Sequence, residues 1–202
     1  MIASALLVHG AGSGPWVFEG WEAALPGVRV RALDLHAGLD VTRASMRDYA
    51  RVVAAAAREL RSPRAVVGWS MGGLAAMMAA PVAGIERLVL LEPSPPAEVA
   101  GNGDGPLEAG LFDPQAVYGA FPDGMRARPE SALARGERRR GISVPGLGPD
   151  AVVIHGDEFP VERGSALAVR YGARAVHLAG LDHWGLVRDP AAIETAAAEV
   201  RR

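Results

Sequence analysis

The sequence predicts an α/β fold in which a mainly parallel sheet of about six strands is flanked by helices on both faces. Short apolar segments alternate with longer helical patterns along most of the 202 residues. Such alternation is typical of parallel strands joined by right-handed helical crossovers. With 50% hydrophobic residues, a chain of this length can form a single domain with a sizeable core.

Six short apolar segments are expected to form the strands, and five segments with helical character are expected to form the helices. The clearest helix is Ser45–Leu60, where Met46, Tyr49 and Val53 fall on one stripe with arginines opposite. The expected strands are Ile2–Val8, Val28–Leu33, Ala65–Gly68, Arg87–Leu91, Ala151–Ile154 and Ala173–Leu178. The expected helices are Val17–Leu25, Ser45–Leu60, Met71–Ala80, Arg163–Tyr171 and Ala191–Val200.

A Gly- and Pro-rich segment from Pro93 to Asp150 interrupts this alternation. Because it falls between two expected strands, it would lie over their carboxyl ends, and we expect a lid-like insertion at about 93–150 within a single domain of residues 1–202. Short helices are expected at Pro114–Phe121 and Pro129–Arg140. The basic run Arg135–Arg140 is more typical of a solvated helix face than of an anion site. If it faced the pocket, it would favour anionic substrates.

The composition excludes several classes of function. A net charge of −2 gives no overall field that attracts nucleic acid or anionic lipid, and the absence of cysteine excludes disulfides, thiolate chemistry and Cys-ligated metal. Met1–Val8 lacks a basic region and leads directly into His9, which is typical of a strand rather than a signal peptide. We therefore expect a soluble cytoplasmic protein without a nucleic-acid or membrane partner. The oligomeric state is not indicated.

The segment Val66–Ala76 carries a Gly-x-Ser-x-Gly motif at Gly68, Ser70 and Gly72. An apolar strand-like run precedes the motif and a helix-compatible run follows it, which is the context of a nucleophile elbow. The glycines leave room for a sharp turn, and Ser70 would stand at a helix N-terminus, where main-chain N–H groups favour a developing negative charge. Although such a motif also occurs by chance in glycine-rich chains, its context here indicates a catalytic serine.

Two loops at expected strand ends could supply what a catalytic serine needs. His9-Gly10-Ala11-Gly12 follows the first strand, and its glycines would let main-chain N–H groups approach a reacting oxygen. His183 lies in a loop after the last strand, from which it can reach a hydroxyl nucleophile as general base. The other histidines occupy positions more typical of packed turns or strands: His9, His36, His155 and His177.

Five motifs together resemble the α/β-hydrolase superfamily over nearly the full chain, in family order. They are His9-Gly10, Asp34-Leu35, Gly68-Trp69-Ser70-Met71-Gly72-Gly73, His155-Gly156-Asp157 and Asp182-His183-Trp184. The opening loop followed by Trp16 is also similar to plant methylesterases and hydroxynitrile lyases. The resemblance implies that Ser70 is the nucleophile, that His183 is the base, and that the N–H groups of Ala11 and Met71 form the oxyanion hole. It also implies a minimal member without the first two strands of the larger fold.

The acid of the triad is where the chain departs from the family pattern. Family members usually read His-Gly-x-x-Asp, but Phe159 occupies the position of that acid and cannot accept a bond from an imidazole N–H. Glu158, one position early with a longer side chain, is the first choice. Glu92, which ends the strand after the elbow helix, is the second choice, and Asp157 is the third. Each of them could instead be an ordinary surface carboxylate or salt-bridge partner.

The leading functional hypothesis is a serine hydrolase that cleaves a small or medium carboxylic ester or thioester through an acyl-enzyme on Ser70. No metal or organic cofactor is expected, because the sequence offers neither a spaced ligand cluster nor a phosphate-binding loop. Trp69 and Trp184, which flank the catalytic loops, would make the substrate pocket apolar. Two alternatives remain open: C–C cleavage or lyase chemistry on the same fold, and a ligand-binding protein with a hydrolase-like pocket.

Overall fold

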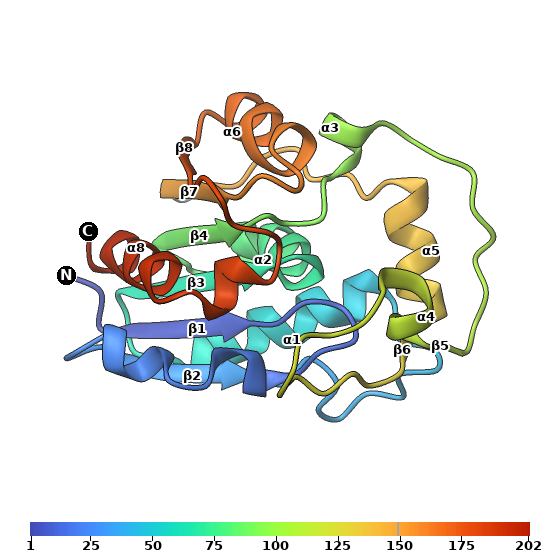
Figure 1. The fold of residues 1–202 in the computed structure, drawn as a ribbon, viewed down its shortest axis with the longest axis horizontal. Helices are drawn as coiled ribbons and strands as arrows, with labels where there is room; N and C mark the ends of the chain where they lie inside the picture. Colours follow the sequence, from blue (N-terminus) through green and yellow to red (C-terminus); the bar gives the residue numbers. More distant parts are fainter. Residues whose placement is uncertain (149) are drawn as a thin grey trace.

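A computed structural model describes residues 1–148 and 150–202, and it confirms a six-stranded parallel sheet with helices on both faces (Figure 1). The strand order is β2-β1-β3-β4-β7-β8, with every neighbouring pair parallel. All six expected strands are present. Their bounds are β1 (Ser4–Val8), β2 (Arg29–Leu33), β3 (Arg64–Trp69), β4 (Arg87–Leu91), β7 (Asp150–His155) and β8 (Arg174–His177).

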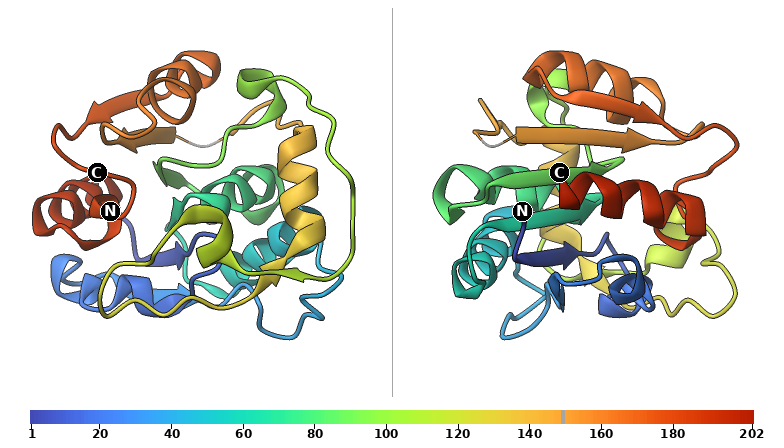
Figure 2. Two further views of the ribbon diagram at one scale, coloured as in Figure 1. Left: turned by 45° about the vertical axis from the view of Figure 1, so that its right-hand side comes forward. Right: turned by 90° about the vertical axis from the view of Figure 1, so that its left-hand side faces the viewer.

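The central strands are buried on both faces, which explains why they read as continuous apolar runs in the sequence. In β1, for example, Leu6 packs into the core on one face and Leu7 into the core on the other. The first core contains α1 (Met46–Glu59), α2 (Met71–Ala83) and α6 (Ala166–Tyr171). The second contains η1 (Pro15–Phe18), η2 (Trp21–Ala24), α7 (Gly185–Arg188) and α8 (Pro190–Arg201), on the opposite side of the sheet (Figure 2).

Two of the expected helices differ in form from the structure. The segment expected as one helix over Val17–Leu25 forms the short turns η1 and η2, because Gly20 between them has a left-handed backbone with φ 86°. The segment expected at Arg163–Tyr171 begins as a wider π-helical turn, η3 (Val161–Ser165), and only then continues as α6. None of the helices in the described residues is both long and apolar enough to cross a lipid bilayer.

The chain between β4 and β7, here called the insertion (residues 93–148), lies beyond the carboxyl ends of the central strands (Figure 1). Residue 149 of the expected insertion lies outside the described residues. The short strands β5 and β6 form an antiparallel pair that the sequence analysis did not predict. The elements of the insertion are α3 (Ala97–Ala100), β5 (Leu111–Phe112), α4 (Pro114–Tyr118), β6 (Glu130–Ser131) and α5 (Ala132–Arg140).

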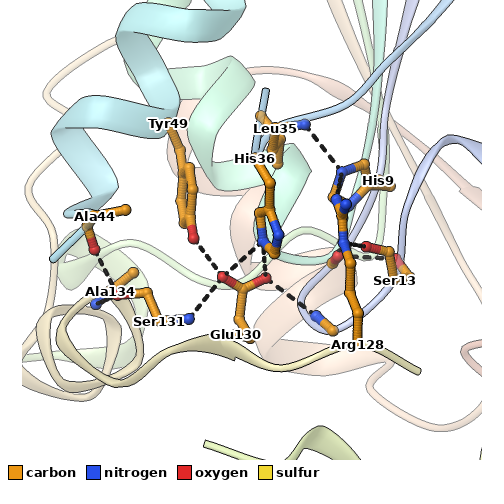
Figure 3. A network of polar contacts seen from close by, with 12 residues as sticks. His9, Ser13, Leu35, His36, Ala44, Tyr49, Arg128, Glu130, Ser131 and Ala134 are labelled. Atoms are coloured by element: carbon orange, nitrogen blue, oxygen red, sulfur yellow. Dashed lines mark hydrogen bonds and ion pairs between the residues drawn. The ribbon is translucent and has the colours of Figure 1, made fainter. Parts of the chain in front are cut away.

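A buried polar network attaches the insertion to the loop after β1 (Figure 3). The fully buried carboxylate of Glu130 accepts hydrogen bonds from the Gly12 N–H at 3.1 Å, from His36 Nε2 at 3.2 Å and from the hydroxyl of Tyr49. Burial alone would raise the pKa of Glu130, but these hydrogen bonds outweigh it and lower the pKa to about 2. Nearby, Arg128 donates to the Ser13 carbonyl at 2.7 Å.

Replacing this buried carboxylate by an amide should destabilise the protein in a pH-dependent way. The folded-state pKa of Glu130 lies below the unfolded value of 4.5, so its stabilisation is present above pH 4.5 and is lost as the pH falls towards 2. Since a tenfold preference for ionisation is worth about 1.4 kcal/mol, we expect Glu130→Gln to lower the free energy of unfolding by roughly 3 kcal/mol at pH 7.

Urea unfolding of both proteins between pH 7 and pH 3 measures this difference, which should stay nearly constant down to about pH 4.5 and shrink below it. Glu108→Gln, at an exposed position of the same insertion, is the matched control and should change the free energy of unfolding little. Equal effects of the two substitutions at pH 7 would contradict the structural role given to Glu130.

Candidate active site

Ser70 occupies a sharp, strained turn between β3 and α2. Its backbone is left-handed, with φ 54° and ψ −123°, a conformation that costs a non-glycine residue on the order of 1–3 kcal/mol. The neighbouring glycines make the turn sterically possible. A Cβ on Gly68 would lie 2.7 Å from the Cα of Gly73, and a Cβ on Gly72 would lie 2.3 Å from the carbonyl oxygen of His9. The serine is therefore held at the tip of an elbow, at the N-terminus of α2.

His183 lies in the loop between β8 and α7, with its imidazole packed between two aromatic rings. The centroid of Trp69 is 5.0 Å from that of the imidazole, and Phe159 meets the imidazole edge-on at 5.6 Å. The indole N–H of Trp69 also donates to the His183 carbonyl at 3.1 Å, which fixes the loop. Burial holds the pKa of His183 below its ordinary value, although the hydrogen bond to Glu92 opposes the shift. The imidazole is consequently neutral at neutral pH.

The carboxylate partner of the His183 ring is Glu92, which directly follows β4. Glu92 is fully buried, and its Oε2 lies 2.7 Å from His183 Nδ1. Its Oε1 accepts the Gly156 N–H at 2.8 Å, so one carboxylate joins the end of β7 to the imidazole. A carboxylate can only accept here, so Nδ1 carries the proton and Nε2 is left with a free lone pair.

The structure places the first choice for this partner, Glu158, and the third, Asp157, away from the His183 ring. Glu158 is exposed and accepts a hydrogen bond from the main-chain N–H of His183 at 2.9 Å, rather than from its ring. Asp157 accepts from His177 Nε2 at 2.6 Å and from the Gly180 N–H at 2.7 Å. After β7 the chain turns outward, which carries both side chains to the surface. The register of the sheet could have indicated Glu92, because Leu91 pairs with Trp69, the residue before Ser70.

Ser70 and His183 line one cavity of about 560 Å³ between the sheet and the insertion. Ala11 and Met71, the expected oxyanion donors, line it too. Among protein groups in the described residues, none accepts a hydrogen bond from the N–H of Ala11 or of Met71. These two main-chain donors are therefore available to a ligand beside the serine. No cluster of His, Asp and Glu side chains in the described part of the chain could hold a metal ion.

The remaining walls of the cavity differ sharply in chemistry. One wall is aromatic and includes Trp69 and Trp184, whose ring centroids are 4.8 Å apart. Phe121 of the insertion packs against Trp184 at 4.8 Å on the same wall. The other wall is basic. It includes three residues of the run that was expected to be a solvated helix face, and one residue of η3: Arg135, Arg138, Arg139 and Arg163.

The fold and the sequence both relate this chain to known proteins. Residues 5–197 match the model of a family described as the alpha/beta hydrolase family. No curated protein matches the chain at a significant level.

Several solved structures share the fold at low sequence identity. Tomato methylketone synthase I is 20% identical, with a TM-score of 0.70 and coverage of 100% of this chain and 98% of that chain. The RedJ thioesterase of the prodiginine pathway in Streptomyces coelicolor is 22% identical, with a TM-score of 0.69 and coverage of 98% and 90%. Polyneuridine aldehyde esterase is 17% identical, with a TM-score of 0.66 and full coverage of both chains. From the family match over nearly its whole length, this chain belongs to the alpha/beta hydrolase family.

Proposed function

We propose that the protein is a serine hydrolase that cleaves a carboxylic ester or thioester of a small molecule through an acyl-enzyme on Ser70. The observation that carries the proposal is the buried contact between Glu92 and His183, in the same cavity as an elbow serine. Membership of the alpha/beta hydrolase family agrees with this chemistry. The esterase and thioesterase named among the similar structures support the fold.

In the proposed reaction, His183 acts as general base and then as general acid. Its Nε2 takes the proton of the Ser70 hydroxyl while the serine oxygen attacks the carbonyl carbon of the substrate. The N–H groups of Ala11 and Met71 stabilise the resulting oxyanion. His183 then gives the proton to the leaving alcohol or thiol. Water, deprotonated by the same nitrogen, attacks the acyl-enzyme and releases the carboxylic acid.

Glu92 would serve this cycle by orienting the imidazole and stabilising it when it becomes charged. The bond between its Oε2 and Nδ1 of His183 keeps the basic lone pair on Nε2, on the far side of the ring. The hypothesis of a non-catalytic binding protein arose from Phe159 in the usual acid position. Glu92 at the ring removes the reason for that alternative. We also propose that the insertion acts as a lid over this site, as part of a single domain.

Removing the serine hydroxyl should abolish turnover and covalent labelling. We expect Ser70→Ala to lower kcat/KM for p-nitrophenyl acetate by at least about 10³-fold, because no other group would form the acyl-enzyme. A fluorophosphonate probe should label the unmodified protein at Ser70. Ser94 lines the same cavity, so Ser94→Ala is the matched control and should still be labelled. Undiminished ester turnover by Ser70→Ala would refute the proposal.

The identity of the acid can be tested by comparing two neighbouring glutamates. Glu92→Gln should lower kcat by about 10⁴-fold, because an amide favours the wrong imidazole tautomer. Glu158→Gln removes the same charge from a residue that touches only the main chain of His183, and should change kcat less than about 10-fold. Steady-state kinetics on p-nitrophenyl acetate, with unfolding midpoints as a check on folding, gives both values. A larger loss in Glu158→Gln would reverse the assignment.

The pH dependence of the reaction should show a base that remains neutral in mild acid. Because the pKa of His183 lies below its ordinary value of 6.5, its basic form persists to lower pH than in a free histidine. The acidic limb of kcat/KM should therefore have its midpoint below pH 6.5, with a plateau at neutral pH. A pH–rate profile on a neutral ester measures it. A midpoint clearly above 6.5 would be inconsistent with the buried imidazole as base.

A further inference from the structure

The basic wall of the cavity is formed by four arginines that come from two separate elements. Arg135, Arg138 and Arg139 lie on α5 of the insertion, and Arg163 lies in η3, after β7. Glu158 is the only carboxylate among the residues that line the cavity. Positive charge is therefore concentrated beside the proposed reaction centre of a protein whose overall charge is −2.

Among the described residues, none of these four guanidinium groups forms an ion pair with a carboxylate. Across residues 1–148 and 150–202, the arginines that do form ion pairs lie outside the basic wall, such as Arg128, which pairs with Asp34. Arg138 donates instead to the neutral hydroxyl of Tyr118 at 3.1 Å. Arg163 stacks 4.0 Å above the ring centroid of Phe159, and Arg135 lies 5.4 Å from that of Phe112.

Two acidic residues next to the basic wall, Glu137 and Glu158, accept hydrogen bonds from main-chain N–H groups. Glu137 of α5 accepts the N–H of Met46 at 2.6 Å, and Glu158 accepts the N–H of His183. Burial lowers the pKa of Arg163, although the nearby carboxylates of Glu92, Glu162 and Glu158 oppose the shift. Like charges that share one partly enclosed cavity repel each other, and a half-buried charge without an ion pair has lost part of its hydration. An anion bound in the cavity would relieve both effects.

We propose that the substrate of this site carries an anionic group, a carboxylate or a phosphate, which the arginine wall binds while the ester or thioester lies at Ser70. Planar guanidinium groups are suited to such oxyanions, because each can donate two parallel hydrogen bonds. The aromatic wall then contacts the apolar part of the substrate between the two ends. This inference rests on the proposed function and adds to it a class of substrate.

The proposal is tested with two esters of the same chain length, the mono-p-nitrophenyl ester of glutaric acid, which ends in a carboxylate, and p-nitrophenyl valerate, which ends in a methyl group. We expect kcat/KM to be about 10- to 100-fold higher for the anionic ester at low ionic strength, the gain typical of a charge-assisted hydrogen bond. The preference should diminish at high salt, because part of the wall is exposed. Equal kcat/KM values for both esters would overturn the proposal and leave the hydrolase assignment intact.

Substitutions of arginines on α5 test which side chains bind the anionic group of the substrate. Arg138→Gln should bring the ratio of the two kcat/KM values towards one. The double variant Arg135→Gln/Arg139→Gln should have the same effect. Neither of these two side chains makes a hydrogen bond to any described residue, so their replacement should not disturb folding. This variant therefore tests the proposal even if Arg138→Gln fails to fold. Arg140 lies on the same helix but binds the Gly105 carbonyl outside the cavity. Arg140→Gln is thus the matched control. A ratio that falls equally in all three variants would refute the assignment of the wall.

Binding measurements separate this inference from the proposed function and identify the anion. Glutarate and inorganic phosphate are titrated separately into the Ser70→Ala variant by calorimetry, at low salt. Binding of either anion that Arg138→Gln weakens at least 10-fold supports the arginine wall, and the tighter ligand identifies the group. If neither anion binds, the wall does not recognise anions. If an anion binds but neither ester is cleaved, the hydrolase assignment fails and the anion site stands.

Discussion

A carboxylate without access to solvent organises the site, and much of the surrounding structure follows from satisfying it. Glu92 has one oxygen on the Gly156 N–H and the other on His183 Nδ1. Burying such a group is unfavourable unless both oxygens have partners. The end of β7 and the loop that carries His183 must therefore both approach the end of β4. The packing of Trp69 and Phe159 around the imidazole completes this arrangement.

Two strained residues lie at the ends of neighbouring strands, and the sheet register explains why they meet. Ser70 follows β3 and Glu92 follows β4, and both have left-handed backbones although neither is a glycine. The Ser70 N–H donates to the carbonyl of Leu91 at 3.1 Å, and the Glu92 N–H donates to Ile154. The hydrogen-bond ladder thus continues one residue beyond the regular strands. It holds both side chains in directions that relaxed backbones would not provide.

The fold could be predicted almost completely from the sequence, because strands buried on both faces leave continuous apolar runs that few other structures produce. Which of the three candidate carboxylates lies at the His183 ring could not be predicted, since this depends on which strand ends are adjacent, and Glu92 is far from His183 in sequence. The pairing of β5 with β6 involves two residues on each strand, which is too short a pattern to detect. The position of the arginines could not be predicted either, because the composition of α5 does not reveal which of its faces lines the cavity.

The network around Glu130 has a consequence for which lengths of ligand the site can accept. Ser131, the next residue, caps α5 by accepting the Ala134 N–H and donates to the Ala44 carbonyl. The loop after β1 and the start of α5 are thereby held on a common anchor. Under the proposed function, the loop after β1 would bind the carbonyl end of a substrate and α5 would bind its charged end. The shared anchor would keep the distance between these two binding elements constant. The protein would then select substrates by the distance between their ester or thioester group and their anionic group.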